Sequence, residues 1–453
     1  MHVSVIGLGK VGLSFASCLA AAGHRVVGVD LDTDLVSSVN RRDIRTPEPG
    51  VAARLARGEP NAVTATTDAA CAVLETAVTF VIVPTPSNAR GGFSLRYVLA
   101  ACDTIGGALR RKADRHTVAI VSTLLPGSSD RMIIPRLEAA SGRTCVDGFG
   151  YCYNPSFIAL GEVVKGIEQP DYLLIGEADA RAGDVILSIH QSMVTVKSPV
   201  ARMTPIEAEI TKIASNAHET MRVSFANMLL SICSEVPGAD VDRVTGALAH
   251  RMGRRFFKGA VPYGGPCWPR DNQALAVFID TVRAISQLPR AVDTFNAEHG
   301  RYVLGKVLAV APPGQTVGVL GLAYKPGTPV IDSSFGIELA RSLAREGRRV
   351  VGWDPLASDD ARTALGDAVE VRSTVEECVA QSNVVVIAIP LPELASIDWR
   401  QAGHVTMVDC WRCLPEDAAG RFRDYVPLGR GPRRDVAAWL DEIAGDAYAP
   451  LVS

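Results

Sequence analysis

Cys267 lies in a short run of residues that could activate a thiol. Two glycines and a proline precede it, and Trp268-Pro269-Arg270-Asp271 follows it. Glycines let a backbone approach a ligand closely, and Arg270 and Asp271 place charge near a thiol whose ordinary pKa is about 8.5. The run therefore contains a candidate covalent nucleophile, although a cysteine taken alone is more often an inert buried side chain.

A glycine-rich turn near the N-terminus could bind the phosphates of a dinucleotide. It follows an apolar run at residues 3–6 and consists of Gly7, Leu8, Gly9, Lys10, Val11 and Gly12. Such a turn brings backbone N–H groups to a pyrophosphate at the N-terminus of a helix. Asp30 closes the next apolar run, where an acid hydrogen-bonds the ribose of NAD and repels the 2′-phosphate of NADP. The sequence favours NAD; the alternative is a similar turn in a domain that binds no dinucleotide.

Lys212 and Asn216 lie four residues apart and project from the same side of a predicted long helix. The helix begins at a capping box, residues 204–207, and is expected to end near Ser234, before Pro237-Gly238. Its apolar stripe consists of Ile206, Ile210, Ile213, Ala217, Met221, Phe225, Met228 and Ile232. The two polar residues lie roughly opposite this stripe, so periodicity alone predicts that their side is solvated.

The elements that must position these residues follow an alternating pattern. Apolar runs at residues 3–6, 25–29, 78–83, 117–121 and 172–175 alternate with helical segments, which predicts a parallel sheet with crossover helices. After a boundary at residues 311–314 the alternation resumes at residues 317–320, 349–353, 384–389 and 405–409. The predicted fold class is α/β, with two Rossmann-like, doubly wound domains joined by a long central helix and further helices. The predicted domains span residues 1–198, 199–310 and 311–453.

The composition argues against several classes of protein. The 453 residues carry a net charge of −3, which offers no basic surface for nucleic acid. No apolar run approaches the roughly 18 residues of a membrane span, and the N-terminus lacks the features of a signal peptide, so we expect a cytoplasmic protein without a membrane partner. The ten cysteines are scattered and are expected to be reduced thiols. Cys410 and Cys413 have CxxC spacing, but no second pair completes a metal site, and no metal is predicted.

Several motifs together resemble the UDP-glucose/GDP-mannose dehydrogenase family. They are the dinucleotide turn, Val83-Pro84-Thr85-Pro86, Ser122-Thr123-Leu124-Leu125-Pro126-Gly127, Asn154-Pro155-Ser156-Phe157, Ala208-Glu209-Ile210-Thr211-Lys212 through Asn216, the Cys267 run and Gly321-Leu322-Ala323-Tyr324-Lys325-Pro326. They occur in the order seen in that family and span almost the whole chain. Because ordered motifs are far more specific than any one of them, the resemblance favours functional roles for Cys267 and for the Lys212/Asn216 pair.

The resemblance implies a four-electron oxidation of the C6 alcohol of a nucleotide-linked hexose to a carboxylate, with two NAD⁺ used in turn. Cys267 would hold a thiohemiacetal and then a thioester, which water hydrolyses. Lys212 and Asn216 match residues that stabilise the developing oxyanion. Asp271 matches a carboxylate that positions water and tunes Lys212, and Thr123 matches a hydroxyl that orders the catalytic water.

The same matching implies residues that bind the cofactor and the substrate. Thr85 and Thr123 would line the nicotinamide side, and Arg270 would also contact the cofactor. Besides Lys212 and Asn216, the implied substrate contacts are Phe157, Ile158, Ala159, Leu160, Phe256, Phe257, Lys258, Gly259, Ala260, Gly264 and Lys325. Arg251 matches an arginine that reaches the sugar in the neighbouring subunit, and the long helix matches the family's dimer core, so a homodimer is implied.

The sequence departs from the family where two carboxylates are expected. Ser156 stands where the family usually has a glutamate, and Leu160 stands where it often has a second one. Without the first carboxylate, general-base assistance would fall to Asp271 and Thr123. We therefore expect slow release of the acyl group from its thioester.

Several activities stay open on the sequence alone. UDP-glucose or dTDP-glucose is the first expected substrate, and GDP-mannose or a UDP-N-acetylhexosamine is the alternative within the same chemistry. A two-electron hydroxyacid dehydrogenase would not need Cys267. A non-catalytic protein that binds NAD or a nucleotide sugar is a different class, and the serine at position 156 keeps it open. Asp332 replaces an arginine expected near the cofactor, and Arg270 replaces a lysine, with the same charge but a different geometry.

Overall fold

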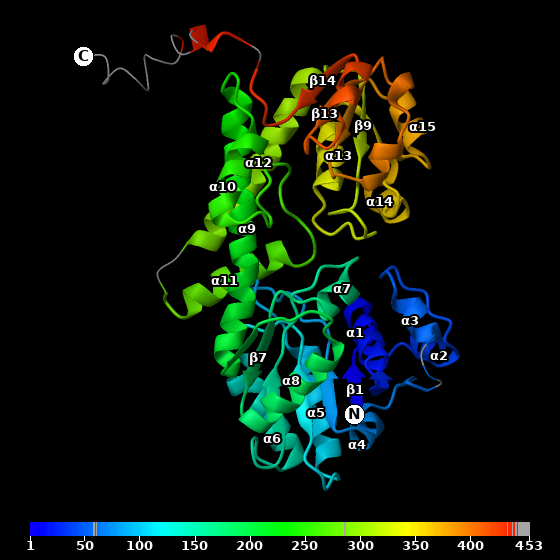
Figure 1. The fold of residues 1–453 in the computed structure, drawn as a ribbon, viewed down its shortest axis with the longest axis vertical. Coiled ribbons are helices and arrows are strands. Elements are labelled where there is room, and N and C mark those ends of the chain that lie inside the picture. The colour runs from blue at the N-terminus through cyan, green and yellow to red at the C-terminus, as the bar shows by residue number, and fades with distance from the viewer. Residues whose placement is uncertain are drawn as a thin grey trace, which may run out of the picture. The chain divides into compact units, whose positions relative to one another are not determined.

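The computed structural model describes residues 1–57, 59, 61–284, 287–432, 434–436, 438–439 and 442. The chain forms two compact units (Figure 1). Unit 1 contains Met1–Ser215 and Gln273–Ile285, and unit 2 contains Asn216–Asn272 and Ser286–Ser453. The predicted domain boundaries at residues 198 and 310 stay a prediction, and residues 443–453 of the predicted third domain lie outside the described residues.

An eight-stranded sheet forms the centre of unit 1 and has the strand order β3-β2-β1-β4-β5-β6-β7-β8. Its strands are β1 (His2–Ile6), β2 (Arg25–Val29), β3 (Val63–Thr66), β4 (Val78–Val81), β5 (Thr117–Ile120), β6 (Gly150–Tyr153), β7 (Leu173–Glu177) and β8 (Val200–Met203). Neighbouring strands are parallel except β6 and β7. The first six strands follow the order of a dinucleotide-binding Rossmann sheet. The five strands expected from the sequence are present.

Helices cover both faces of this sheet. They are α1 (Lys10–Ala21), α2 (Thr33–Arg41), α3 (Val51–Arg57), α4 (Ala69–Glu75), α5 (Arg96–Leu109), α6 (Ile134–Ser141), α7 (Val163–Glu168) and α8 (Ala180–Met193), with a π-helical turn at Ser129–Ile133. Successive residues of β5 enter different apolar clusters: Ala119 packs with α1 and α8, whereas Val118 and Ile120 pack with α5 and α6. The sheet is therefore buried on both faces, as its continuous apolar strands predict.

The long helix α9 (Pro205–Glu235) belongs to unit 1 up to Ser215 and to unit 2 beyond it. The predicted capping box is present, since Glu207 accepts from the N–H and the hydroxyl of Thr204 at 2.9 and 2.6 Å. Lys212 is only 8% exposed, whereas Ile210 is 47% exposed. The solvated-face interpretation is therefore wrong for Lys212, because periodicity identifies an apolar face without saying which partner covers it.

Unit 2 is built around a second, wholly parallel sheet with the order β11-β10-β9-β12-β13-β14. Its strands are β9 (Thr316–Leu320), β10 (Arg349–Trp353), β11 (Glu370–Val371), β12 (Val384–Ile387), β13 (Thr406–Asp409) and β14 (Asp424–Pro427). The other longer helices are α10 (Val241–Met252), α11 (Trp268–Thr281, which continues into unit 1), α12 (Leu288–Val310), α13 (Phe335–Arg345), α14 (Ser358–Leu365) and α15 (Val375–Ala380). The α/β fold class with two Rossmann-like sheets and a long central helix is confirmed. Among the described helices, none combines the length and apolar character that a bilayer span requires.

Candidate active site

The glycine-rich turn connects β1 to α1 in unit 1. Gly7 has φ of +96°, and a Cβ at Gly12 would lie 1.8 Å from the Gly7 carbonyl oxygen, so neither position accepts a side chain. Asp30 follows β2 and accepts from the backbone N–H of Leu8 at 2.7 Å, which fixes its carboxylate beside the turn. Carboxylate oxygens have further lone pairs, so Asp30 can still accept from a ribose hydroxyl. With Lys10 and Val11 in the first turn of α1, the geometry fits a bound dinucleotide.

Two loops at the carboxyl edge of the same sheet carry the predicted threonines. Thr85 follows β4 and donates its hydroxyl to the backbone carbonyl of Thr123, which follows β5, at 2.9 Å. Ser122 joins the same loops by accepting from the N–H of Val83 at 3.0 Å and donating to its carbonyl at 2.7 Å. The structure thus brings Thr85 and Thr123 together at the edge where open α/β sheets bind ligands.

Lys212 projects from α9 toward the loop that follows β6. Its Nζ donates to the carbonyl oxygen of Ser156 at 2.8 Å and lies 4.6 Å from the centre of the Phe157 ring. The contact at position 156 uses the backbone, so any residue there could hold the lysine. The other predicted substrate residues of this loop follow directly: Ile158 and Leu160 are partly buried, and Ala159 is exposed.

Glu209, one turn before Lys212, was not among the predicted site residues. It is fully buried and accepts from the N–H of Gly127 at 2.5 Å, and from the N–H and hydroxyl of Ser129 at 2.8 and 2.7 Å. Burial raises the pKa of Glu209, although the bonds from Ser129 and Gly127 act in the opposite direction. This carboxylate anchors the loop that carries Thr123 to the helix that carries Lys212.

Glu209→Gln should therefore disturb both the fold and the loop of Thr123. A glutamine amide has only one acceptor oxygen and would point its NH₂ group at a backbone donor, which costs about 1–3 kcal/mol for the unpaired buried group. The loss of stability is measured as the decrease in the free energy of unfolding, determined by urea denaturation. The matched control is Glu207→Gln at the exposed start of the same helix, which should cost well under half as much; equal losses in the two variants would contradict the anchoring role.

In unit 2, Cys267 is exposed and directly precedes α11. Asp271, one turn along, is 1% exposed. One of its oxygens accepts from the amide of Asn216 at 2.6 Å, and the other accepts from Nε and Nη2 of Arg270 at 3.0 and 2.9 Å. The positive end of the helix dipole lies at Cys267 and favours an anion there. All ten cysteines lie in the described part of the chain, and none of them forms a disulfide there.

The Cys267 loop packs against the segment that carries Lys325. The N–H of Gly265 donates to the carbonyl of Asp332 at 3.0 Å, and the ring of Tyr324 lies against Gly265. Lys325 follows this tyrosine, with Nζ 6.0 Å from its ring centre. A Cβ at Gly264 would lie 2.0 Å from the carbonyl oxygen of Ser333 in the same segment. The structure thus brings the predicted nucleophile and Lys325 onto adjoining segments of unit 2.

The predicted nucleotide loop, Phe256 to Ala260, is held by backbone contacts to helices. Asn227 of α9 accepts from the N–H of Ala260 at 2.8 Å and donates to the carbonyl of Val261 at 3.0 Å. His299 of α12 donates through Nε2 to the carbonyl of Ala260 at 2.8 Å, since a carbonyl can only accept; burial lowers the pKa of this histidine, although the bond to Ala260 acts in the opposite direction. Phe257 is buried and stacks on Phe225, while Phe256 and Lys258 are exposed. Arg251 lies exposed in the last turn of α10.

Domain profiles of one family match the chain in three consecutive stretches. The NAD-binding domain of the UDP-glucose/GDP-mannose dehydrogenase family matches residues 1–194, its central domain matches residues 206–298, and its UDP-binding domain matches residues 318–416. The chain belongs to the UDP-glucose/GDP-mannose dehydrogenase family. The predicted family and the predicted cofactor NAD are thereby confirmed. The family comprises NAD-dependent nucleotide-sugar 6-dehydrogenases.

Individual members of the family cover most of the chain. UDP-glucose 6-dehydrogenase of Haloferax volcanii is 34% identical over 88% of this chain and 93% of its own length. GDP-mannose 6-dehydrogenase of Pseudomonas aeruginosa is 33% identical over 77% of this chain and 79% of its own. The solved structure of a UDP-glucose dehydrogenase from Pyrobaculum islandicum superposes with a TM-score of 0.86, at 32% identity over 95% of this chain and 98% of that one. The relatives therefore include dehydrogenases of both sugar types.

Proposed function

We propose that this chain oxidises the C6 alcohol of UDP-glucose or dTDP-glucose to the carboxylate of the corresponding nucleotide-linked glucuronate. The observation that carries the proposal is the exposed Cys267 at the start of α11, one turn before the buried carboxylate of Asp271. A simple two-electron oxidation of an alcohol needs no such thiol. The turn from Gly7 to Gly12 and Asp30 would hold NAD⁺, which would supply the hydride acceptor for each of the two oxidation steps.

Cys267 carries the intermediates in this proposal. Loss of a hydride and a proton converts the C6 alcohol to an aldehyde, and the sulfur of Cys267 then adds to the aldehyde carbon. The thiol proton passes to the oxygen, and loss of a second hydride from that carbon together with the hydroxyl proton leaves a thioester. Water adds to the thioester, the carbon–sulfur bond breaks, and the carboxylate product leaves the free thiol behind.

Lys212 and Asn216 stabilise negative charge on the C6 oxygen as the sulfur adds and as water attacks. A cation and an amide donor are suited to this task when they are held in place before the reaction. Lys212 is held by the Ser156 carbonyl and Asn216 by the Asp271 carboxylate, so each has a fixed starting position.

Asp271 and Thr123 position the water that hydrolyses the thioester. Both oxygens of Asp271 already accept hydrogen bonds, from Asn216 and Arg270. A carboxylate whose two oxygens are both engaged is better suited to orienting water and neighbouring donors than to removing a proton. This favours a slow final step.

The identity of the sugar rests on similarity. The UDP-glucose 6-dehydrogenase of Haloferax volcanii is 34% identical over 88% of this chain, whereas the GDP-mannose 6-dehydrogenase of Azotobacter vinelandii is 28% identical over 93%, and the higher identity supports glucose. GDP-mannose is the second candidate because the GDP-mannose enzyme of Pseudomonas aeruginosa, at 33%, is almost as similar as the Haloferax volcanii enzyme, at 34%.

A panel of nucleotide sugars tests the function. We expect UDP-glucose or dTDP-glucose to yield two NADH per molecule oxidised, because aldehyde and thioester formation each release one hydride. GDP-mannose and UDP-N-acetylglucosamine should have kcat/KM values lower by about tenfold or more, since an ill-fitting sugar or base commonly costs 1.4 kcal/mol or more. NADH and product are measured together. One NADH per molecule would favour a two-electron dehydrogenase, and no turnover with any of the sugars would refute the proposal.

We further propose a homodimer through α9. The apolar residues Ile206, Ile210, Phe225 and Ile232 are each 40–49% exposed and lie within an arc of roughly 100° on the helix. An apolar stripe of this length on a single chain favours burial against a second copy. In the dimer, the exposed Arg251 is proposed to reach the sugar bound by the partner subunit.

A further inference from the structure

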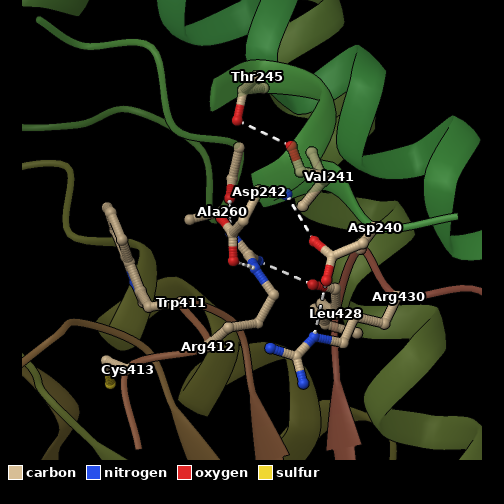
Figure 2. A network of polar contacts seen from close by, with 12 residues as sticks. Asp240, Val241, Asp242, Thr245, Ala260, Trp411, Arg412, Cys413, Leu428 and Arg430 are labelled. Atoms are coloured by element: carbon tan, nitrogen blue, oxygen red, sulfur yellow. Dashed lines mark hydrogen bonds and ion pairs between the residues drawn. The ribbon is translucent and has the colours of Figure 1, made fainter. Parts of the chain in front are cut away.

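Arg412 links three segments of unit 2 that are distant in the sequence (Figure 2). It follows β13 in the CxxC run and has φ of +52°, a left-handed conformation that is costly for a residue with a side chain. Its side chain is 0% exposed. A strained backbone and a wholly buried guanidinium persist only where neighbouring residues hold them in place, so the contacts of Arg412 must supply this stabilisation.

All five N–H donors of the guanidinium are used within the protein. Nε and Nη2 donate to the two oxygens of Asp242 at 2.8 and 3.0 Å, and Nη1 donates to the carbonyls of Cys410 and Leu428 at 3.0 and 2.7 Å. The remaining donor, on Nη2, reaches the carbonyl of Gly259 at 2.6 Å. An arginine has five donors and no acceptor, so Arg412 has none left for a ligand.

The bond to Gly259 reaches the middle of the nucleotide loop. The next residue, Ala260, is fixed through its backbone N–H by Asn227 and through its carbonyl by His299. Lys258, the preceding residue, is exposed and carries the only charge between Phe256 and Ala260. Arg412 therefore holds the backbone one residue after Lys258.

Asp242 orients the guanidinium from the first turn of α10. Burial alone would raise the pKa of Asp242, but the hydrogen bonds and charge of Arg412, with smaller contributions from Lys258 and Arg430, lower it. Its side chain is 37% exposed, so the pair is buried on the arginine side only. A two-bond pairing fixes the plane of the guanidinium, and with it the direction of the donor that reaches Gly259.

We propose that Arg412 is a positioning residue that sets nucleotide affinity by holding the loop at Gly259, with Asp242 as its orienting partner. This rests on the proposed function of the loop Phe256 to Ala260 in binding the nucleotide. The pair acts through the loop backbone and makes no contact with the reacting carbon, so its loss changes substrate binding far more than the chemical steps.

The test compares Arg412→Lys and Asp242→Asn in the full-length enzyme with UDP-glucose and, if it is turned over better, dTDP-glucose. Lysine at position 412 keeps the positive charge but has no planar guanidinium. Asparagine at position 242 removes the negative charge that orients Arg412. We expect KM to rise by about tenfold, the effect of losing one well-placed hydrogen bond to a charged group, while kcat changes by less than about twofold. Hydrogen exchange in the segment 256–263 should become faster in both variants.

Arg430→Met is the matched control. Arg430 pairs with Asp240, two residues before Asp242 at the start of the same helix, at 3.4 Å. Figure 2 shows both arginines at this helix start. The control removes a neighbouring ion pair and leaves the bond to Gly259 in place, so KM should stay within about twofold of the unaltered enzyme.

An unchanged KM in Asp242→Asn would overturn the proposal, even if the exchange of the loop became faster. Asp242→Asn alone decides the outcome if Arg412→Lys does not fold. If the unaltered chain oxidises no nucleotide sugar, the proposed function fails. The positioning role is then tested by the affinity for UDP, measured by calorimetry, in place of KM. Weaker UDP binding in Asp242→Asn than in Arg430→Met then supports the positioning role, and equal or absent binding rejects it.

Discussion

Cys267→Ala is expected to abolish formation of the nucleotide-linked carboxylate, with a loss of kcat on the order of 10³-fold or more, as for other covalent nucleophiles. Without the sulfur no thioester can form, so any residual NADH should come from the first oxidation only. The measurement is the NADH-to-carboxylate ratio at completion, together with the steady-state rate.

Cys71→Ala is the control for this result. Cys71 is also an exposed thiol, and its Sγ donates to Glu75 within α4 at 3.2 Å. Its loss should leave the rate and the stoichiometry unchanged. Undiminished carboxylate formation by Cys267→Ala would exclude the thioester route and favour an oxidation that needs no nucleophile.

The strands that the sequence did not predict are short, and several lack continuous apolar patterning. Strand β8 (Val200–Met203) has no buried residue, and β3 (Val63–Thr66) has one. An edge strand packs on few neighbours, so its side chains need not be apolar, and backbone pairing with β7 or β2 holds it in place. Most central strands were predictable because both of their faces are covered, but the buried central strand β6 (Gly150–Tyr153) was missed.

The apolar periodicity of α9 did not predict which of its sides is buried within this chain. The apolar stripe with Ile206 and Ile232 predicted the buried side of the helix, yet these residues are 40% and 49% exposed and Lys212 is buried. The capping box and Pro237-Gly238 predicted the start and the end of the helix correctly to within about one residue. The family resemblance, which rests on the order of motifs, was needed to assign Lys212 a role.

Residues that hold the site were harder to predict than residues proposed to act in it. Thr123, Lys212 and Asp271 lie within sequence motifs, so their types and spacing were informative. Arg412 was seen only as part of a CxxC run, because its bond to Gly259 joins positions 153 apart in the chain. A long-range bond to a backbone carbonyl imposes no pattern on the sequence around either partner.

Ser156→Glu is expected to accelerate hydrolysis of the Cys267 thioester by roughly 10²-fold, the usual contribution of a general base. The unaltered chain has a serine at this position, and both oxygens of Asp271 are already engaged, so attack of water should limit its rate. Rapid quenching followed by mass spectrometry of the intact protein should detect an acylated Cys267 that accumulates before steady state, and the adduct should be lost in Ser156→Glu.

Ser156→Gln separates the base from the size of the side chain. Lys212 bonds the backbone carbonyl of residue 156, which every substitution retains, so both variants should keep that lysine in place. Glutamine matches glutamate in length and cannot accept a proton, so its thioester should persist as in the unaltered chain. Equal acceleration by both substitutions would assign the effect to packing, and rapid turnover of the unaltered chain with no detectable adduct would show that serine at this position does not slow the release of product.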